Sequence, residues 1–226
     1  MNPQQAAQGL SVVVDGGGPA TLKIFFLMTV LSLLPAIVLS MTSFVRVVIV
    51  LSFLRTALGT PQLPPNPVLI GLSIFLSFFI MGRTFDDLNA TALQPYLDDK
   101  IGYVEAGDQA ASVMKSFMLP QTRDEDLALF YDLGHLSAPS SVGDIPLRVV
   151  VPAFLVSELT TAFKMGLYLF IPLILIDLLV ASVLMSLGMM MVPPAMVALP
   201  LKIAVFLLAD GWRLVVAALA RSFHGA

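Results

Sequence analysis

The feature that most constrains this chain is a series of apolar stretches, each as long as a whole helix and nearly free of charge. Leu22–Ser40 carries only Lys23, and the forty residues of Val149–Gly188 carry three charged side chains. About 20 apolar residues in a helix cross the roughly 30 Å of bilayer hydrocarbon. A soluble domain would need a polar exterior, yet 58% of the 226 residues are hydrophobic and 12% are charged. The pattern predicts an all-α integral membrane protein.

Composition also excludes several function classes. The net charge of −3 and the scattered basic residues argue against a nucleic-acid partner, which would need clustered Lys and Arg. The chain has no cysteine, and its two histidines, His135 and His224, are too far apart in sequence for metal-ligand spacing. The Gly16–Gly18 run lacks the Lys-Ser/Thr of a phosphate loop and is interpreted as a linker. We therefore expect no metal, no cofactor and no enzymatic activity.

The chain divides into four segments by composition. Residues 1–21 carry no Lys or Arg and no apolar run, which predicts a flexible tail and not a signal peptide in its usual form. Residues 22–83 predict a first apolar helical hairpin. Residues 84–145 hold eleven acidic residues against three basic ones, which predicts a water-exposed helical insert. Residues 146–226 predict a second apolar hairpin.

Prolines and basic residues refine this plan. Pro35 should bend or break the first apolar helix, Val149–Gly188 should form one long or broken helix, and Ala195–Phe223 should form the last helix. Arg46 and Arg55 favour a cytoplasmic position for the first turn, which would place the insert on the outer side of the membrane.

Two charges stand out because their own helices offer no opposite charge three or four residues away. These are Glu158 and Lys202. An unpaired charge in apolar surroundings is costly, so the two could pair with each other, within one subunit or between neighbours. The alternative is that either side chain extends to a polar boundary.

The run Met189, Met190 and Met191 follows Gly188 and precedes two prolines, so it should form a loop at a hairpin tip. From the residues alone, a methionine-filled turn that packs against a neighbour is the simpler interpretation. The other is a deformable apolar constriction, built where such loops from several subunits converge.

Four ordered blocks resemble the flagellar biosynthetic protein FliP family, the fourth of which runs from residue 157 through residue 194. They are MTSFVRVVIVLSFLRTALGT at 41–60, PPNPVLIGL at 64–72, FMLPQTR at 117–123, and the stretch from SELTTAF at 157–163 through LGMMMVPP at 187–194. The resemblance covers residues 22–223. It implies a core subunit of the type III protein export gate in the bacterial inner membrane, in the flagellar basal body, with the insert on the periplasmic side.

The resemblance also implies partners and site residues. Five copies would assemble with FliQ and FliR around a pore that conducts unfolded flagellar proteins, in contact with lipid and other export apparatus proteins. It favours the constriction for the three methionines and places Phe117, Arg123 and Phe130 in the region where the outer insert assembles. Without it, Phe117 and Phe130 are ordinary core residues and Arg123 an ordinary solvated cation.

Alternative functions remain at this point. An injectisome export-gate subunit is the nearest relative of the flagellar one. A small-solute or proton-coupled transporter is less well supported, because such proteins typically show internal repeats and discontinuous helices, and this sequence has no obvious repeat.

Overall fold

The computed structural model describes residues 18–60, 62–137 and 142–223, and every regular element in that part of the chain is helical. The predicted all-α fold is therefore confirmed. The chain divides into two compact units, residues 1–39 and 40–226. The first unit contains most of α2 (Gly18–Ser40), which continues through Pro35, so the proline does not break this helix.

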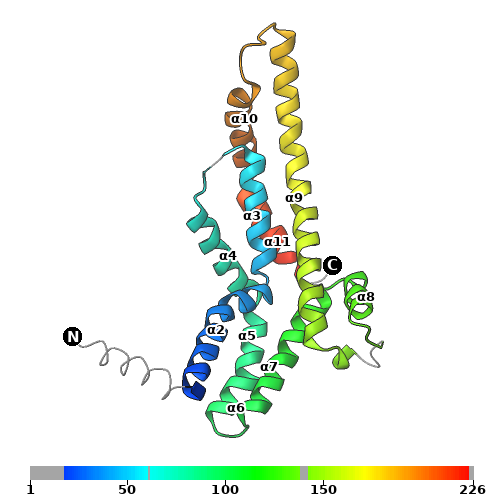
Figure 1. Ribbon diagram of the computed structural model, residues 1–226. Coiled ribbons are helices and arrows are strands. Elements are labelled where there is room, and N and C mark those ends of the chain that lie inside the picture. Colours follow the sequence, from blue (N-terminus) through cyan, green and yellow to red (C-terminus); the bar gives the residue numbers. More distant parts are fainter. Residues whose placement is uncertain (1–17, 61, 138–141, 224–226) are drawn as a thin grey trace, which may run out of the picture. The chain divides into compact units, whose positions relative to one another are not determined.

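The second unit contains the remaining helices, most of them joined by short turns (Figure 1). In chain order they are α3 (Phe44–Leu58), α4 (Asn66–Ile80), α5 (Gly82–Leu88), the π-helix η1 (Asn89–Leu93), α6 (Gln94–Leu97), α7 (Tyr103–Met118), the 3₁₀ turn η2 (Leu119–Gln121), α8 (Asp124–Leu133), the 3₁₀ turn η3 (Val142–Asp144), α9 (Leu147–Ser186), α10 (Pro194–Leu208) and α11 (Gly211–Arg221).

The main core of the second unit lies between α3 and α9, which run side by side in Figure 1. Val47, Val50 and Leu51 of α3 are completely buried there, and α4 and α11 add further apolar side chains. α3 ends because Gly59 adopts a left-handed conformation with φ of 78° and its amide donates to the carbonyl of Thr56. A second apolar cluster joins α7, α8 and the first turns of α9. The two clusters fix α9 along much of its length.

α9 is the one helix of the described residues that is long and apolar enough to cross a membrane unaided. Its 40 residues include Pro152 and Pro172, and neither proline interrupts it. Up to four spans are possible if each of three bent pairs counts as one, namely α2 with α3, α4 with the helices up to Leu97, and α10 with α11.

The last apolar segment is two helices, which corrects the prediction of one helix over Ala195–Phe223. α10 and α11 meet at an angle of 63°. The break occurs because Asp210 adopts a left-handed backbone conformation with φ of 52°. Gly211 follows, and a Cβ at that position would overlap the ring of Phe206. The bend therefore depends on Asp210 and Gly211 together.

Candidate functional site

A buried arginine connects helices that are far apart in the sequence. Arg46 of α3 is 2% exposed and Glu158 of α9 is completely buried. The Arg46 guanidinium donates through Nε to Glu158 Oε2 at 2.8 Å, and a second bond joins its Nη2 to Glu158 Oε1. Two parallel bonds of this kind are the strongest arrangement an arginine and a carboxylate make. The pair therefore fixes α3 against α9 at one level.

The C-terminal end of α11 completes this centre. Arg46 Nη1 donates to the carbonyl and the hydroxyl of Ser222, both at 2.9 Å. The centroid of the Phe223 ring lies 3.7 Å from the guanidinium carbon. Gln121 donates from Nε2 to the Phe223 carbonyl at 3.1 Å. We call Arg46, Glu158, Gln121, Ser222 and Phe223 the Arg46 centre. Its donors and acceptors satisfy one another, which is what a buried charge requires.

Lys202 of α10 forms a second interhelical contact. Its ammonium donates to Asp177 of α9 at 2.6 Å and to the Ala57 carbonyl in the last turn of α3 at 3.0 Å. A cation is favourable at a helix C-terminus, where carbonyls lack intrahelical partners. Lys202 is buried, whereas Asp177 remains 42% exposed. This contact fixes the α9–α10 hairpin onto the end of α3.

The structure gives Glu158 and Lys202 different partners from the ones predicted. Within this chain they do not pair with each other, because Glu158 bonds Arg46 and Lys202 bonds Asp177. Both need a partner, as the sequence indicated, but tertiary packing supplies it from residues with no regular spacing to them. The sequence did not identify Arg46 and Asp177 as the ion-pair partners of Glu158 and Lys202. The only local signal for that role was a charged residue within an apolar segment.

The residues expected to assemble the outer insert lie within this chain's own second core or beside it. The Phe117 ring packs edge-on against Phe154, with centroids 6.1 Å apart, and stacks on Phe223 at 6.3 Å. Phe130 packs at the edge of the same cluster.

Arg123 joins the start of α8 to α9. Its guanidinium donates two bonds of 2.8 Å to Asp126, and Ser157 of α9 donates to the same carboxylate at 2.5 Å. Burial raises the pKa of Asp126, but the hydrogen bonds from Arg123 and Ser157 and the charge of Arg123 outweigh it and hold that pKa below the ordinary 3.8. The hydrogen bond to Asp126 raises the pKa of Arg123. The Arg123 side chain is therefore held in place by its bonds to Asp126 and is not simply a solvated surface cation.

The three methionines lie where the sequence predicts a loop, between α9 and α10. Gly188 has φ of 75°, its amide donates to the Met185 carbonyl, and the Met189 amide donates to the Leu184 carbonyl. This pair of bonds is the Schellman motif, which ends a helix at glycine. Met189, Met190 and Met191 are 44%, 84% and 96% exposed, so the tip presents thioether side chains outward from the chain. We call Met189–Val192 the Met turn.

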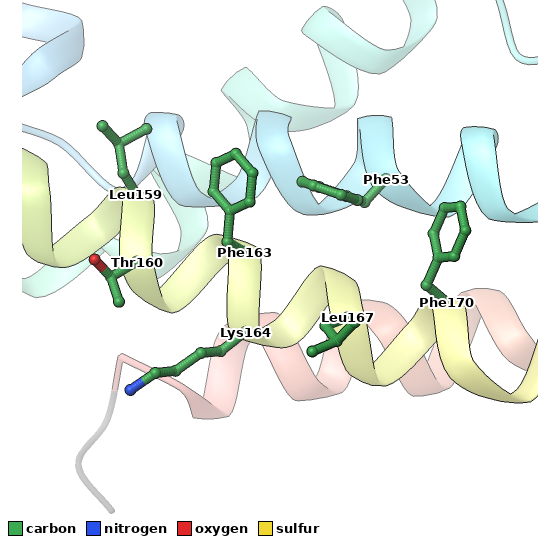
Figure 2. A pocket seen from close by; sticks show the side chains of 7 residues that line it. All are labelled: Phe53, Leu159, Thr160, Phe163, Lys164, Leu167 and Phe170. Atoms are coloured by element: carbon green, nitrogen blue, oxygen red, sulfur yellow. The ribbon is translucent and has the colours of Figure 1, made fainter.

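An apolar groove of about 690 Å³ runs between α3 and α9. Figure 2 shows Phe53 of α3 on one side and a row of α9 side chains on the other. Phe53 meets Phe163 edge to face at 5.1 Å, and it lies so close to Gly166 that a Cβ there would come within 2.6 Å of the ring. Thr160 and Lys164 form the polar edge. The lining residues are Phe53, Leu159, Thr160, Phe163, Lys164, Leu167 and Phe170.

The fold is all-α, with one helix able to cross a membrane and further bent pairs of helices. It also has interhelical ion pairs whose basic side chains, Arg46 and Lys202, are buried. Together these features define a helical membrane protein. In the described residues no group of three His, Asp or Glu side chains is placed to hold a metal ion. The FliP family model matches residues 27–219, and the chain belongs to the FliP family.

The relatives agree with this assignment. The flagellar biosynthetic protein FliP of Bacillus subtilis is 53% identical over 204 residues, which cover 90% of this chain and 92% of the relative. The flagellar biosynthetic protein FliP of Caulobacter vibrioides is 53% identical over 198 residues, which cover 88% of this chain and 74% of the relative. The flagellar biosynthetic protein FliP of Aquifex aeolicus is 47% identical over 214 residues, which cover 94% of this chain and 90% of the relative. The family is thus one of flagellar biosynthetic proteins, with a membrane and flagellar location.

Proposed function

We propose that this chain is a core subunit of the flagellar type III protein export gate. In this proposal, five copies of the chain assemble with FliQ and FliR in the bacterial inner membrane. The assembly surrounds a pore through which unfolded flagellar proteins pass. The insert at 84–145 lies on the periplasmic side. Membership of the FliP family carries this proposal, because the relatives that cover most of the chain are named for flagellar biosynthesis.

The Met turn is the proposed constriction. Its side chains are unbranched, apolar and largely exposed, and the helices on either side hold it at the tip of a hairpin. Methionine adapts to irregular surroundings with little strain, so turns from several subunits could converge into an apolar seal that yields to a passing chain. A turn buried in its own chain could not do this.

The assembly is tested by the mass of the gently solubilised complex. We expect the full chain, co-expressed with its FliQ and FliR partners, to purify with both in one complex that contains several copies of the chain. A variant with Arg213→Gln, which alters an exposed side chain of α11, serves as a matched control and should assemble equally well. A lone monomer that retains a small solute would contradict the proposal and favour a transporter.

A further inference from the structure

The backbone bend between α10 and α11 has an energetic cost that other contacts must offset. Asp210 lies at the bend with φ of 52°, a left-handed conformation that is unfavourable for a residue with a Cβ. Counted together, α10 and α11 are as long and apolar as one membrane-spanning helix, but they meet at 63°. The bent arrangement is therefore held by contacts between α11 and the rest of the second unit.

One narrow apolar face holds α11 along its length. Val215 and Leu219 are buried in the main core, whereas Leu214 on another face is 60% exposed. The helix has 11 residues and therefore rises about 16 Å. A helix this short moves as one rigid body when its apolar face separates from the core.

The C-terminal end of α11 adds an attachment at the point furthest from the bend. Ser222 accepts two bonds of 2.9 Å from Arg46, through its carbonyl and its hydroxyl. Phe223 is 7% exposed, and its ring stacks on Phe117. We call Ser222 and Phe223 the latch. Because of their distance from Asp210, the contacts of the latch resist rotation of α11 about the bend most effectively.

The latch can open without leaving the buried Arg46 charge unpaired. The two bonds to Glu158 come from Nε and Nη2 of Arg46, whereas both bonds to Ser222 come from Nη1. A cleft of about 610 Å³ lies beside Ser222, and residues of α5, α7 and α9 line it. A cleft of this size admits water, which can replace the bonds from Arg46 to Ser222. Opening therefore leaves the ion pair between α3 and α9 in place.

We propose that α11 is a strap that pivots at Asp210 and is closed by the latch. In the closed state, which is the structure described above, Ser222 and Phe223 lie against Arg46. In the open state α11 continues the axis of α10, Asp210 takes a helical conformation, and Arg46 keeps Glu158. Ser222 follows Arg46 and Glu158 in the sequence, so the strap closes onto a pair that has already been synthesised. This inference does not depend on the proposed export function.

The test measures distances between pairs of spin labels in the full chain, purified in detergent. The chain has no cysteine, so Ser116→Cys and Arg221→Cys place labels at two exposed positions, one in the wall of the cleft and one at the end of α11. We expect a short distance from the closed strap. Phe223→Ala removes the apolar half of the latch and should add a second, longer distance.

A second label pair shows whether α11 pivots or unfolds. Met196→Cys and Arg221→Cys are exposed positions at the outer ends of α10 and α11. A straight helix separates the two backbone positions by about 38 Å, so Phe223→Ala should add a narrow distance near that value. A broad distribution would show that α11 unfolds, and would overturn the proposal.

Two changes at Asp210 test the pivot in the Phe223→Ala chain. Asp210→Gly should lower the ratio of open to closed strap about fivefold, because glycine adopts the left-handed conformation without strain. Asp210→Ala should raise that ratio about fivefold. Arg213→Gln is the control, because it breaks the exposed pair with Asp210 and leaves the backbone preference unchanged. A single short distance in Phe223→Ala would overturn the proposal. So would an increase of the open strap in Asp210→Gly, which is the response of a merely flexible joint.

Discussion

The two ends of the α9 hairpin differ in how completely their side chains are satisfied. Near its first third, Glu158 is buried and bonded in the Arg46 centre, which also holds the C-terminal turn at Ser222. At its far end the Met turn exposes Met190 and Met191 almost fully. A satisfied buried network fixes a fold, whereas an exposed apolar tip is a surface for something outside the chain. Under our proposal, the difference separates residues that stabilise the fold of this subunit from residues that act in an assembly.

The largest effect on stability is expected from a change at Glu158, in the Arg46 centre. Changing Glu158 to Gln should destabilise the chain by about 3–5 kcal/mol, because it leaves the buried Arg46 charge without its carboxylate. Thermal unfolding in detergent measures the loss. Asp98→Asn removes one partner of the exposed pair with Lys100 and is the matched control, expected to change little. Equal effects in the two variants would show that the Arg46 centre does not hold the fold.

The middle of α9 should be sensitive to a single methyl group. Gly166→Ala places a Cβ against the Phe53 ring and should cost about 1–3 kcal/mol through overpacking. Gly71→Ala is the control, since no atom lies within 4 Å of the added Cβ, and it should stabilise α4 by up to about 1 kcal/mol. A second change, Phe53→Leu, should recover part of the loss in Gly166→Ala. If it recovers none, the contact between Phe53 and Gly166 is not the cause.

A smaller, pH-dependent effect is expected at the start of α8. The folded pKa of Asp126 is below its ordinary 3.8, so its stabilisation is present above about pH 4 and is lost as the pH falls through the folded value. Asp126→Asn should cost about 1 kcal/mol at pH 7, because Arg123 is one-third exposed and water screens the pair. The variant should also lose less stability than the parent between pH 5 and pH 3. An identical acid response in both would exclude this role for Asp126.

Local patterns in the sequence predicted some of these features and long-range contacts set the others. Apolar length predicted the all-α fold, and Gly188 with the following prolines predicted the loop of the Met turn, because helix ends depend on neighbouring residues. The partner of Glu158 lies 112 residues away, and no local spacing encodes that contact.

The bend between α10 and α11 had a local signal in the sequence but was still not predicted. Asp210 and Gly211 are residues that tolerate or favour unusual backbone angles, so the signal was present, but the apolar run around them favoured one helix. The partner of Lys202 was hidden for a different reason. Asp177 belongs to another helix, and only the packing of α10 against α9 brings the two together.

The most direct test of the account is the permeability of cells that carry Met189→Ala, Met190→Ala and Met191→Ala together. The three side chains are largely exposed in the single chain, so we expect the variant to fold and to assemble with its partners. The apolar seal would be gone, and we predict that ions or small solutes leak through the assembled complex. A membrane that stays tight although the variant complex has assembled would contradict the proposed constriction, and loss of assembly would assign the Met turn to packing instead.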